Sequence, residues 1–179
     1  MNRRRWLLAT GAGLTGTLAG ATWWLRGEPA PIAGFNDLAA AREWLQRVRH
    51  AGVVASLTAW SPAQVVEHLA QSIEYSMIGY PQAKPAWFQA SLGRLAGAAF
   101  QRAGAMQHDL EAPIPGAPTL AAALLAPACD RLQAALDGFE AHTGLLQPHF
   151  AYGVLSRDAY LRAHLMHIAD HAAKLELQA

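Results

Sequence analysis

Cysteine and charged residues are both scarce in this chain of 179 residues. Its single cysteine, Cys129, excludes an intramolecular disulfide, a thiolate-rich zinc site and haem attachment through a CxxCH motif. We expect Cys129 to pack inside a helix as a small apolar residue. Charged residues make up 15% of the sequence and the formal net charge is +1, which gives no electrostatic basis for binding nucleic acid.

Apolar residues are abundant instead, at 53% of the sequence, which is enough for one compact domain with a substantial core. They recur at helical spacing, and no stretch shows sustained alternation of apolar and polar residues. The clearest helix start is Ser61-Pro62-Ala63-Gln64, a capping box with proline at the first helical position. The sequence predicts five helices. Four have a capping residue at their start, Asn36 or Asp37, Ser61, Thr119 and Ser156, and the third helix begins at Pro85.

The predicted helices end near residues 51, 78, 106, 142 and the C-terminus, and irregular segments separate them. Residues 107–118 contain three prolines and a glycine, so they must form a loop, and residues 144–155 form another. Pro127 lies inside the fourth helical pattern and should kink that helix or mark its true start. We therefore predict an all-α fold, a four-helix bundle with one shorter additional N-terminal helix.

The first 27 residues differ from the rest of the chain. Arg3-Arg4-Arg5-Trp6-Leu7-Leu8 resembles a twin-arginine export signal, and Ala19-Gly20-Ala21 matches a cleavage site of small residues. The alternative is an uncleaved membrane anchor from Trp6 to Leu25. In both cases we expect residues 28–34 to be a linker and residues 35–179 to fold in the periplasm, with membrane contact only through the N-terminal segment.

Three histidines recur at helical spacing near the end of the chain: His164, His167 and His171. They fall within an arc of roughly 60° on one helix face. At about 1.5 Å per residue, His164 and His171 lie about 10 Å apart along the axis, which is too far for one metal ion. His167 and His171 have the i, i+4 spacing by which one helix offers two imidazoles to a single cation.

A third ligand must come from a facing helix, and His68 is the best candidate because it lies midway along the second predicted helix. The face of that helix around His68 carries further polar side chains, Gln64, Gln71, Ser72 and Tyr75. A polar stripe on an otherwise apolar helix indicates a wet pocket inside the bundle. We therefore predict a metal site formed by His68, His167 and His171, with the open fourth position that is typical of catalytic zinc sites.

Several other polar residues receive secondary roles from the sequence. Asp170 can orient a ligand through a hydrogen bond. Glu67 and Glu74 are candidates for a general base that acts on a metal-bound water, although neither shares the His68 face cleanly. His149 and Tyr152 are expected to order the loop that enters the last helix. Three histidines at helix ends or in loops are expected on the surface: His50, His108 and His142.

Three segments, taken in order, resemble the DinB/YfiT-type proteins. They are Trp60-Ser61-Pro62-Ala63-Gln64-Val65-Val66-Glu67-His68-Leu69-Ala70-Gln71-Ser72, His149-Phe150-Ala151-Tyr152-Gly153-Val154-Leu155-Ser156 and His167-x-x-x-His171. More narrowly, they are similar to a domain-of-unknown-function branch of that superfamily, and the likeness covers about residues 35–175.

The resemblance implies an up-down-down-up four-helix bundle with a divalent metal, zinc or nickel. One histidine of an early helix and two of a late helix hold that metal, and these roles fall here on His68, His167 and His171. Relatives often carry a double histidine where Asp170 precedes His171 here. A late pair formed by His164 and His167 is therefore the alternative.

Some relatives are thiol transferases that use bacillithiol, mycothiol or glutathione, and others have no known activity. Two hypotheses follow for this chain. In the first, it is an exported metal-dependent transferase or hydrolase that acts on an unidentified small molecule. In the second, it is a non-catalytic exported bundle that binds metal or a ligand, with structural histidines as the limiting case. The sequence leaves open whether the protein is an enzyme and whether it forms a homodimer.

Overall fold

The computed structural model describes residues 28–120 and 124–178, so the predicted export segment at residues 1–27 lies outside the described part of the chain. A π-helical turn, η1 (Gln89–Gly93), joins α4 directly to α5, and two short strands are present, β1 (Val53–Ser56) and β2 (Leu175–Gln178). The α-helices are α2 (Leu38–His50), α3 (Pro62–Ile78), α4 (Ala86–Phe88), α5 (Arg94–Ala103), α6 (Leu125–Ala141) and α7 (Arg157–Ala172). The expectation of an all-α bundle is confirmed.

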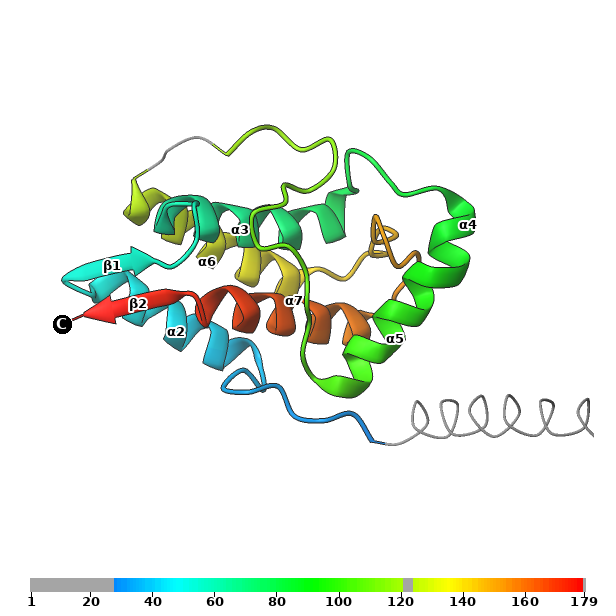
Figure 1. Cartoon of the computed structure of the whole chain (residues 1–179), viewed down its shortest axis with the longest axis horizontal. Coiled ribbons are helices and arrows are strands. Elements are labelled where there is room, and N and C mark those ends of the chain that lie inside the picture. The colour runs from blue at the N-terminus through cyan, green and yellow to red at the C-terminus, as the bar shows by residue number, and fades with distance from the viewer. Residues whose placement is uncertain (1–27, 121–123, 179) are drawn as a thin grey trace, which may run out of the picture.

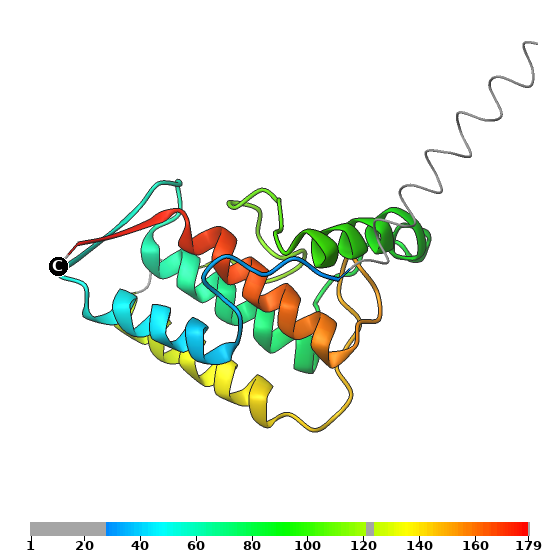
Figure 2. The same ribbon diagram turned by 90° about the horizontal axis from the view of Figure 1, so that it is seen from below.

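The bundle consists of α2, α3, α6 and α7 (Figures 1 and 2). In Figure 1, α3 and α6 run in one direction while α2 and α7 run in the other, which is an up-down-down-up order. The two strands lie at one end of the bundle, and the stretch α4–η1–α5 lies at the opposite end. Between α5 and α6 the chain crosses the face formed by α3 and α7.

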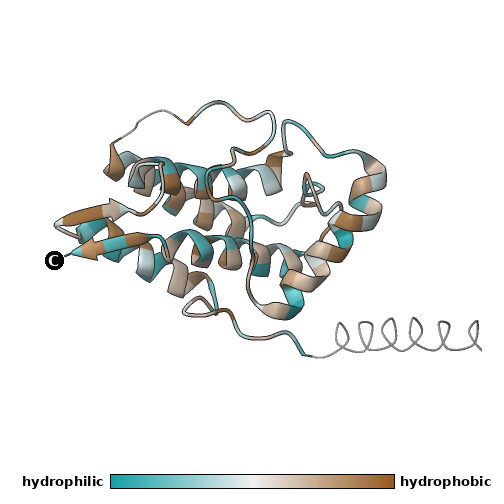
Figure 3. Cartoon of the chain, viewed as in Figure 1, coloured by the Kyte–Doolittle hydropathy of each residue, from teal (hydrophilic) through white to brown (hydrophobic). Residues whose placement is uncertain are grey.

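The membership of the bundle differs from the expectation that the first helix would be the additional one. Helix α2 buries Trp44, Leu45 and Val48 and packs on α6, so it belongs to the bundle. The helical stretch 86–103 is the additional element, because α5 buries only Gly97. Trp87, Leu92 and Leu95 of this stretch remain exposed, whereas Phe100 packs against the core. Figure 3 shows hydrophobic residues in brown among polar ones along these helices.

The predicted helix starts are well supported by capping contacts. The Ser61 hydroxyl accepts a hydrogen bond from the Gln64 amide at 3.3 Å, and the Gln64 side chain accepts one from the Ser61 amide at 2.9 Å. Asp37, rather than Asn36, caps α2, and Ser156 caps α7. These contacts satisfy amide groups that a helix leaves unpaired at its start.

Two helix boundaries differ from the sequence prediction. Helix α6 begins at Leu125 and not after Thr119, which places Pro127 in its first turn, where a missing amide hydrogen costs no helical hydrogen bond. Helix α7 ends at Ala172, and the following residues form β2, which pairs antiparallel with β1. Each strand has four residues, too few for an alternating pattern to be recognised.

The core fills the space between the four bundle helices. Cys129 is fully buried there, as expected. Residues 28–34 have no helix or strand, but Ile32 is buried against the bundle core. The largest side chains of the core include Leu45, Leu69, Leu136, Phe139 and Tyr160.

No helix in the described part of the chain is both long and apolar enough to cross a membrane.

Candidate metal centre

The three histidines predicted as ligands meet inside the bundle. His68 comes from α3, and His167 and His171 come from α7. The Nε2 atom of His167 lies 3.2 Å from Nε2 of His68 and 3.2 Å from Nε2 of His171. The exposed fractions of the three residues are 3%, 8% and 1% for His68, His167 and His171, so the meeting point is closed to bulk water on most sides.

A fourth histidine, His108, joins them from the connection between α5 and α6. Its ring packs edge-on against His167 and His171, with ring centroids 5.0 and 5.3 Å apart. One nitrogen from each of the four rings lies within 4.8 Å of the others, so this histidine cluster can hold a metal ion. His108 is exposed, as expected, but its ring also faces the cluster, a contact that the sequence did not predict.

Asp170 contacts His108 and not one of the three predicted ligands. Its Oδ2 atom lies 3.0 Å from Nδ1 of His108. This close contact does not have the geometry of a hydrogen bond, but it places Nδ1 of His108 against the carboxylate and leaves Nε2 as the nitrogen available to the cluster. Burial raises the pKa of Asp170 and lowers the pKa of His108, and the attraction between the two groups opposes both shifts.

His164 lies outside the histidine cluster. Its Nε2 atom is 3.2 Å from the hydroxyl of Ser76, which itself donates to the Ile73 carbonyl at 2.6 Å. Because that hydroxyl proton is already used, His164 must donate to Ser76. The alternative late pair of His164 and His167 therefore does not come together, since His164 points toward α3 one turn earlier along α7.

The two glutamates near His68 face away from the cluster. Arg131 of α6 bonds Glu74 through two nitrogens, at 2.9 and 2.7 Å, and also bonds Glu67. These ion pairs occupy both carboxylates, so neither glutamate serves as a base at the cluster. The ring of His68 is instead held by packing, because Trp60 lies edge-on to it at 5.0 Å. The Nδ1 atom of His68 has no hydrogen-bond partner among the described residues.

The donor set fits a metal ion better than a network of hydrogen bonds. A neutral ring nitrogen has either one proton or one lone pair, so Nε2 of His167 cannot satisfy two facing nitrogens with ideal geometry. Burial lowers the pKa of His68 to about 4 and that of His171 to about 2, so both rings are neutral at pH 7. Ligands at about 2.0–2.1 Å from one tetrahedral ion lie roughly 3.3 Å apart, which matches the 3.2 Å separations.

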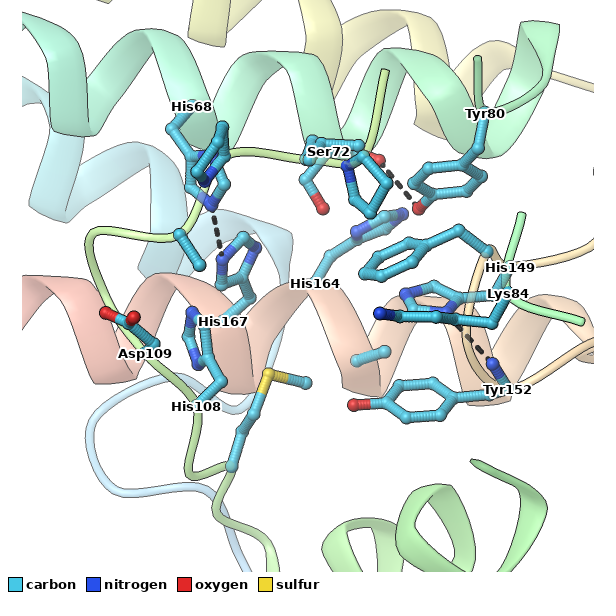
Figure 4. A pocket seen from close by; sticks show the side chains of 17 residues that line it. His68, Ser72, Tyr80, Lys84, His108, Asp109, His149, Tyr152, His164 and His167 are labelled. Atoms are coloured by element: carbon cyan, nitrogen blue, oxygen red, sulfur yellow. Dashed lines mark hydrogen bonds between the residues drawn. The ribbon is translucent and has the colours of Figure 1, made fainter. Parts of the chain in front are cut away.

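A cavity of about 270 Å³ opens beside the histidine cluster. His68, His108 and His167 line one end of it, and the turn that contains His149 and Tyr152 lines the other (Figure 4). The rings of His149 and Tyr152 stack at 4.2 Å with an angle of 5° between them. As predicted, these two residues order the loop before α7, and they also face the cavity.

The comparison with protein families gives one match to this chain. The family described as "Protein of unknown function (DUF1569)" matches residues 33–178. The chain belongs to this family. No curated protein and no solved structure matches it. The region matched to the DUF1569 family contains the histidine cluster and the cavity, whereas the wider DinB/YfiT resemblance and the export signal remain predictions.

In this member of the DUF1569 family, only some of the residues in the polar stripe on α3 line the cavity. Ser72 lines the cavity beside His68, and its carbonyl accepts a hydrogen bond from the Tyr80 hydroxyl at 3.2 Å. Gln64 serves the capping box and donates to the Leu120 carbonyl at 3.3 Å. The stripe therefore predicted the cavity correctly, but some of its members have structural partners.

Proposed function

We propose that the protein binds one divalent metal ion, zinc or nickel, through His68, His167 and His171 and acts as a metal-dependent transferase or hydrolase. The observation that supports this is the convergence of three buried, neutral imidazole nitrogens at the end of a cavity. Imidazole donors suit zinc and nickel. When bound, such an ion supplies Lewis-acid chemistry to a substrate in the cavity.

His108 distinguishes the enzyme from the second candidate, a non-catalytic metal-binding bundle. A fourth histidine ligand closes a tetrahedral site, as in structural metal sites, and the short distance to the cluster favours that candidate. A His108 that stays uncoordinated is instead a proton-transfer group held by Asp170 beside an open position. We favour the enzyme, because a closed structural site has no need of an adjoining cavity.

Metal analysis tests the binding proposal. The protein is purified without a histidine tag, and its metal content is compared with that of His167→Ala and of His50→Ala. His50 lies at the exposed end of α2 and is the matched control. We expect about one ion per chain in the parent and in His50→Ala, and less than about a tenth of that in His167→Ala. Equal, near-zero metal in all three folded proteins would contradict the proposal.

Cobalt substitution tests whether the fourth position is open. Azide is added to the cobalt-loaded protein, and the visible absorption bands of the ion are recorded. An open position predicts that azide shifts the bands of the parent protein. If azide shifts only the bands of His108→Ala, then His108 fills the position and the non-catalytic bundle is the better description.

We also propose that the chain is exported to the periplasm. The proposal is supported by Arg3-Arg4-Arg5-Trp6-Leu7-Leu8 and by the small residues that follow. In the native host, the double variant Arg3→Lys, Arg4→Lys should remain in the cytoplasmic fraction, whereas the parent should reach the periplasm or the outer face of the inner membrane. Equal distribution of the two proteins would contradict export by this route.

A further inference from the structure

The two ends of the cavity differ in chemistry (Figure 4). At one end lie the histidine cluster and Asp109, which is the one carboxylate among the described residues that line the cavity. At the other end lie Lys84, His149 and Tyr152. That second end, which we call the donor end, therefore carries a positive charge and hydrogen-bond donors with no carboxylate beside them.

His149 presents a fixed donor at this end. Its Nδ1 atom accepts hydrogen bonds from the backbone amides of Ala151 and Tyr152, at 3.1 and 3.3 Å. A ring nitrogen that accepts hydrogen bonds has no proton of its own, so the proton of the neutral ring is on Nε2. Figure 4 shows this second nitrogen facing the middle of the cavity. The backbone of the turn thus sets which nitrogen donates.

Lys84 is anchored to the same turn through its backbone. Its amide donates to the Phe150 carbonyl at 2.8 Å, and its carbonyl accepts from the Gln89 side chain at 2.9 Å. The turn itself is closed by paired backbone hydrogen bonds of 2.8 and 3.0 Å between His149 and Gly153. From this rigid base, the Lys84 ammonium and the hydroxyl of Tyr152 both point toward the histidine cluster (Figure 4).

The space between the donor end and the histidine cluster is largely apolar. Its walls include Met106, Pro113, Ile114 and Phe150. The volume of about 270 Å³ lies just below the range of roughly 300–1,000 Å³ that is common for ligand pockets, so the occupant is small. A single cationic side chain together with neutral donors matches a monoanion better than a multiply charged phosphate group.

We propose that Lys84, His149 and Tyr152 bind the carboxylate of a small organic acid whose apolar body fills the cavity. The other end of this acid faces the histidine cluster, and only that second contact rests on the proposed function. The ligand class of the donor end is therefore a small monocarboxylic acid with an apolar or aromatic body, and its role as a substrate also rests on the proposed function.

Binding of phenylacetate and of its neutral counterpart phenylacetamide tests the donor end. Calorimetric titrations use the metal-loaded protein and the protein stripped of metal with a chelator. In the metal-free parent, we expect phenylacetate to bind at least about 10-fold more tightly than phenylacetamide, because the charge-assisted bond to Lys84 needs the carboxylate. The preference should disappear in Lys84→Met and persist in Lys84→Arg.

Two further variants keep the test specific. Arg47→Met removes a surface cation of α2 far from the cavity and should leave the preference unchanged. His149→Phe keeps a flat ring in the turn but removes the Nε2 donor together with the Nδ1 acceptor of the turn amides, so the preference should fall. The exposed side chain of Lys84 contributes little to packing, and all variants are first compared by circular dichroism.

The failure of this inference is distinguishable from the failure of the proposed function. The proposed binding of a carboxylate at the donor end is wrong if the metal-free parent binds both probes with equal affinity. It is also wrong if the preference for phenylacetate persists in Lys84→Met. If the preference exists only in the metal-loaded protein and is unchanged in Lys84→Met, the carboxylate binds the metal. That result also contradicts the proposed role of the donor end. A Lys84-dependent preference in a protein that takes up no metal supports the donor end and contradicts the proposed function.

Discussion

The Nδ1 atom of His108 lies 3.0 Å from Oδ2 of Asp170, and this contact joins the connection after α5 to the helix that carries His167 and His171. The carboxylate fixes the ring of His108 with its other nitrogen toward the histidine cluster. The contact therefore completes the cluster from a part of the chain that has no regular secondary structure.

Loss of the Asp170 carboxylate distinguishes the two roles of His108. In the favoured enzyme His108 is not a ligand, so we expect Asp170→Asn to bind metal as tightly as the parent does. If His108 were the fourth ligand, the affinity should fall by about 10- to 100-fold, which is the usual effect of removing a partner that orients a metal-bound histidine. Competition with a chromophoric chelator measures the affinity. Asp158→Asn, at the exposed first turn of the same helix, is the control and should bind as the parent does. A loss of affinity in Asp170→Asn but not in Asp158→Asn would show that His108 is a ligand and would favour the non-catalytic bundle.

Metal should be retained at mildly acidic pH. Burial lowers the pKa of His68 to about 4 and that of His171 to about 2, so protons compete with the metal only near or below those values. After dialysis at pH 5.5, we expect most of the metal to remain bound, and we expect release as the pH approaches about 4. Elemental analysis of the dialysed samples gives the result. Release with a midpoint near 6.5, the ordinary pKa of histidine, would contradict the burial of these rings.

The metal-free protein should lose stability as the pH falls. Burial lowers the pKa of His149 and of His164 to about 3, whereas both titrate near 6.5 in the unfolded chain. Below about pH 6.5 the unfolded state binds more protons than the folded state does. The contribution of each buried, neutral ring to the free energy of unfolding is therefore complete above that pH and is lost as the pH falls toward about 3. Each histidine adds up to about 1.4 kcal/mol per pH unit to the slope.

Urea unfolding of the metal-free protein at pH 7.5 and 5.5 measures this slope. In the metal-free protein, burial also lowers the pKa of His68 and of His171, so these rings add to the slope. His149→Phe removes one of the contributing rings and should flatten the dependence by the share of that ring. An unchanged slope in His149→Phe would mean that the ring is open to water and titrates normally.

Two glycines should respond in opposite ways to alanine. A Cβ atom on Gly93 would lie 2.0 Å from the Ala151 carbonyl oxygen, so η1 or the turn beside it must move. We expect Gly93→Ala to destabilise the protein by roughly 2 kcal/mol or more. Gly138 lies inside α6, where the nearest atom to a new Cβ is a methyl group of Met77 at 3.6 Å. Gly138→Ala should therefore stabilise by about 0.5–1 kcal/mol, as measured by chemical unfolding.

Local signals predicted much of this structure because each depends on neighbours in the sequence. The capping box at Ser61, the caps Asp37 and Ser156, and the i, i+4 pair of His167 and His171 are all read within a few residues. His68 was predicted because it lies midway along the second predicted helix, on a face that carries further polar side chains.

Other features depend on contacts between distant segments and have no local pattern. His108 lies in a loop, and its position is set by Asp170 and by two rings of α7. Lys84 likewise comes to the cavity because its backbone is bonded to the Phe150 carbonyl. Strand β2 was predicted as the end of α7, since only its pairing with β1 makes it a strand.

The contact between His68 and His167 spans 99 positions of the chain. An ion held by both would act as a crosslink that closes a very long loop and so would restrict the unfolded ensemble, as a disulfide across such a loop does. Chelation should then lower the melting temperature of the entire bundle instead of loosening the cavity alone. Thermal denaturation would thus report metal occupancy without any knowledge of the reaction.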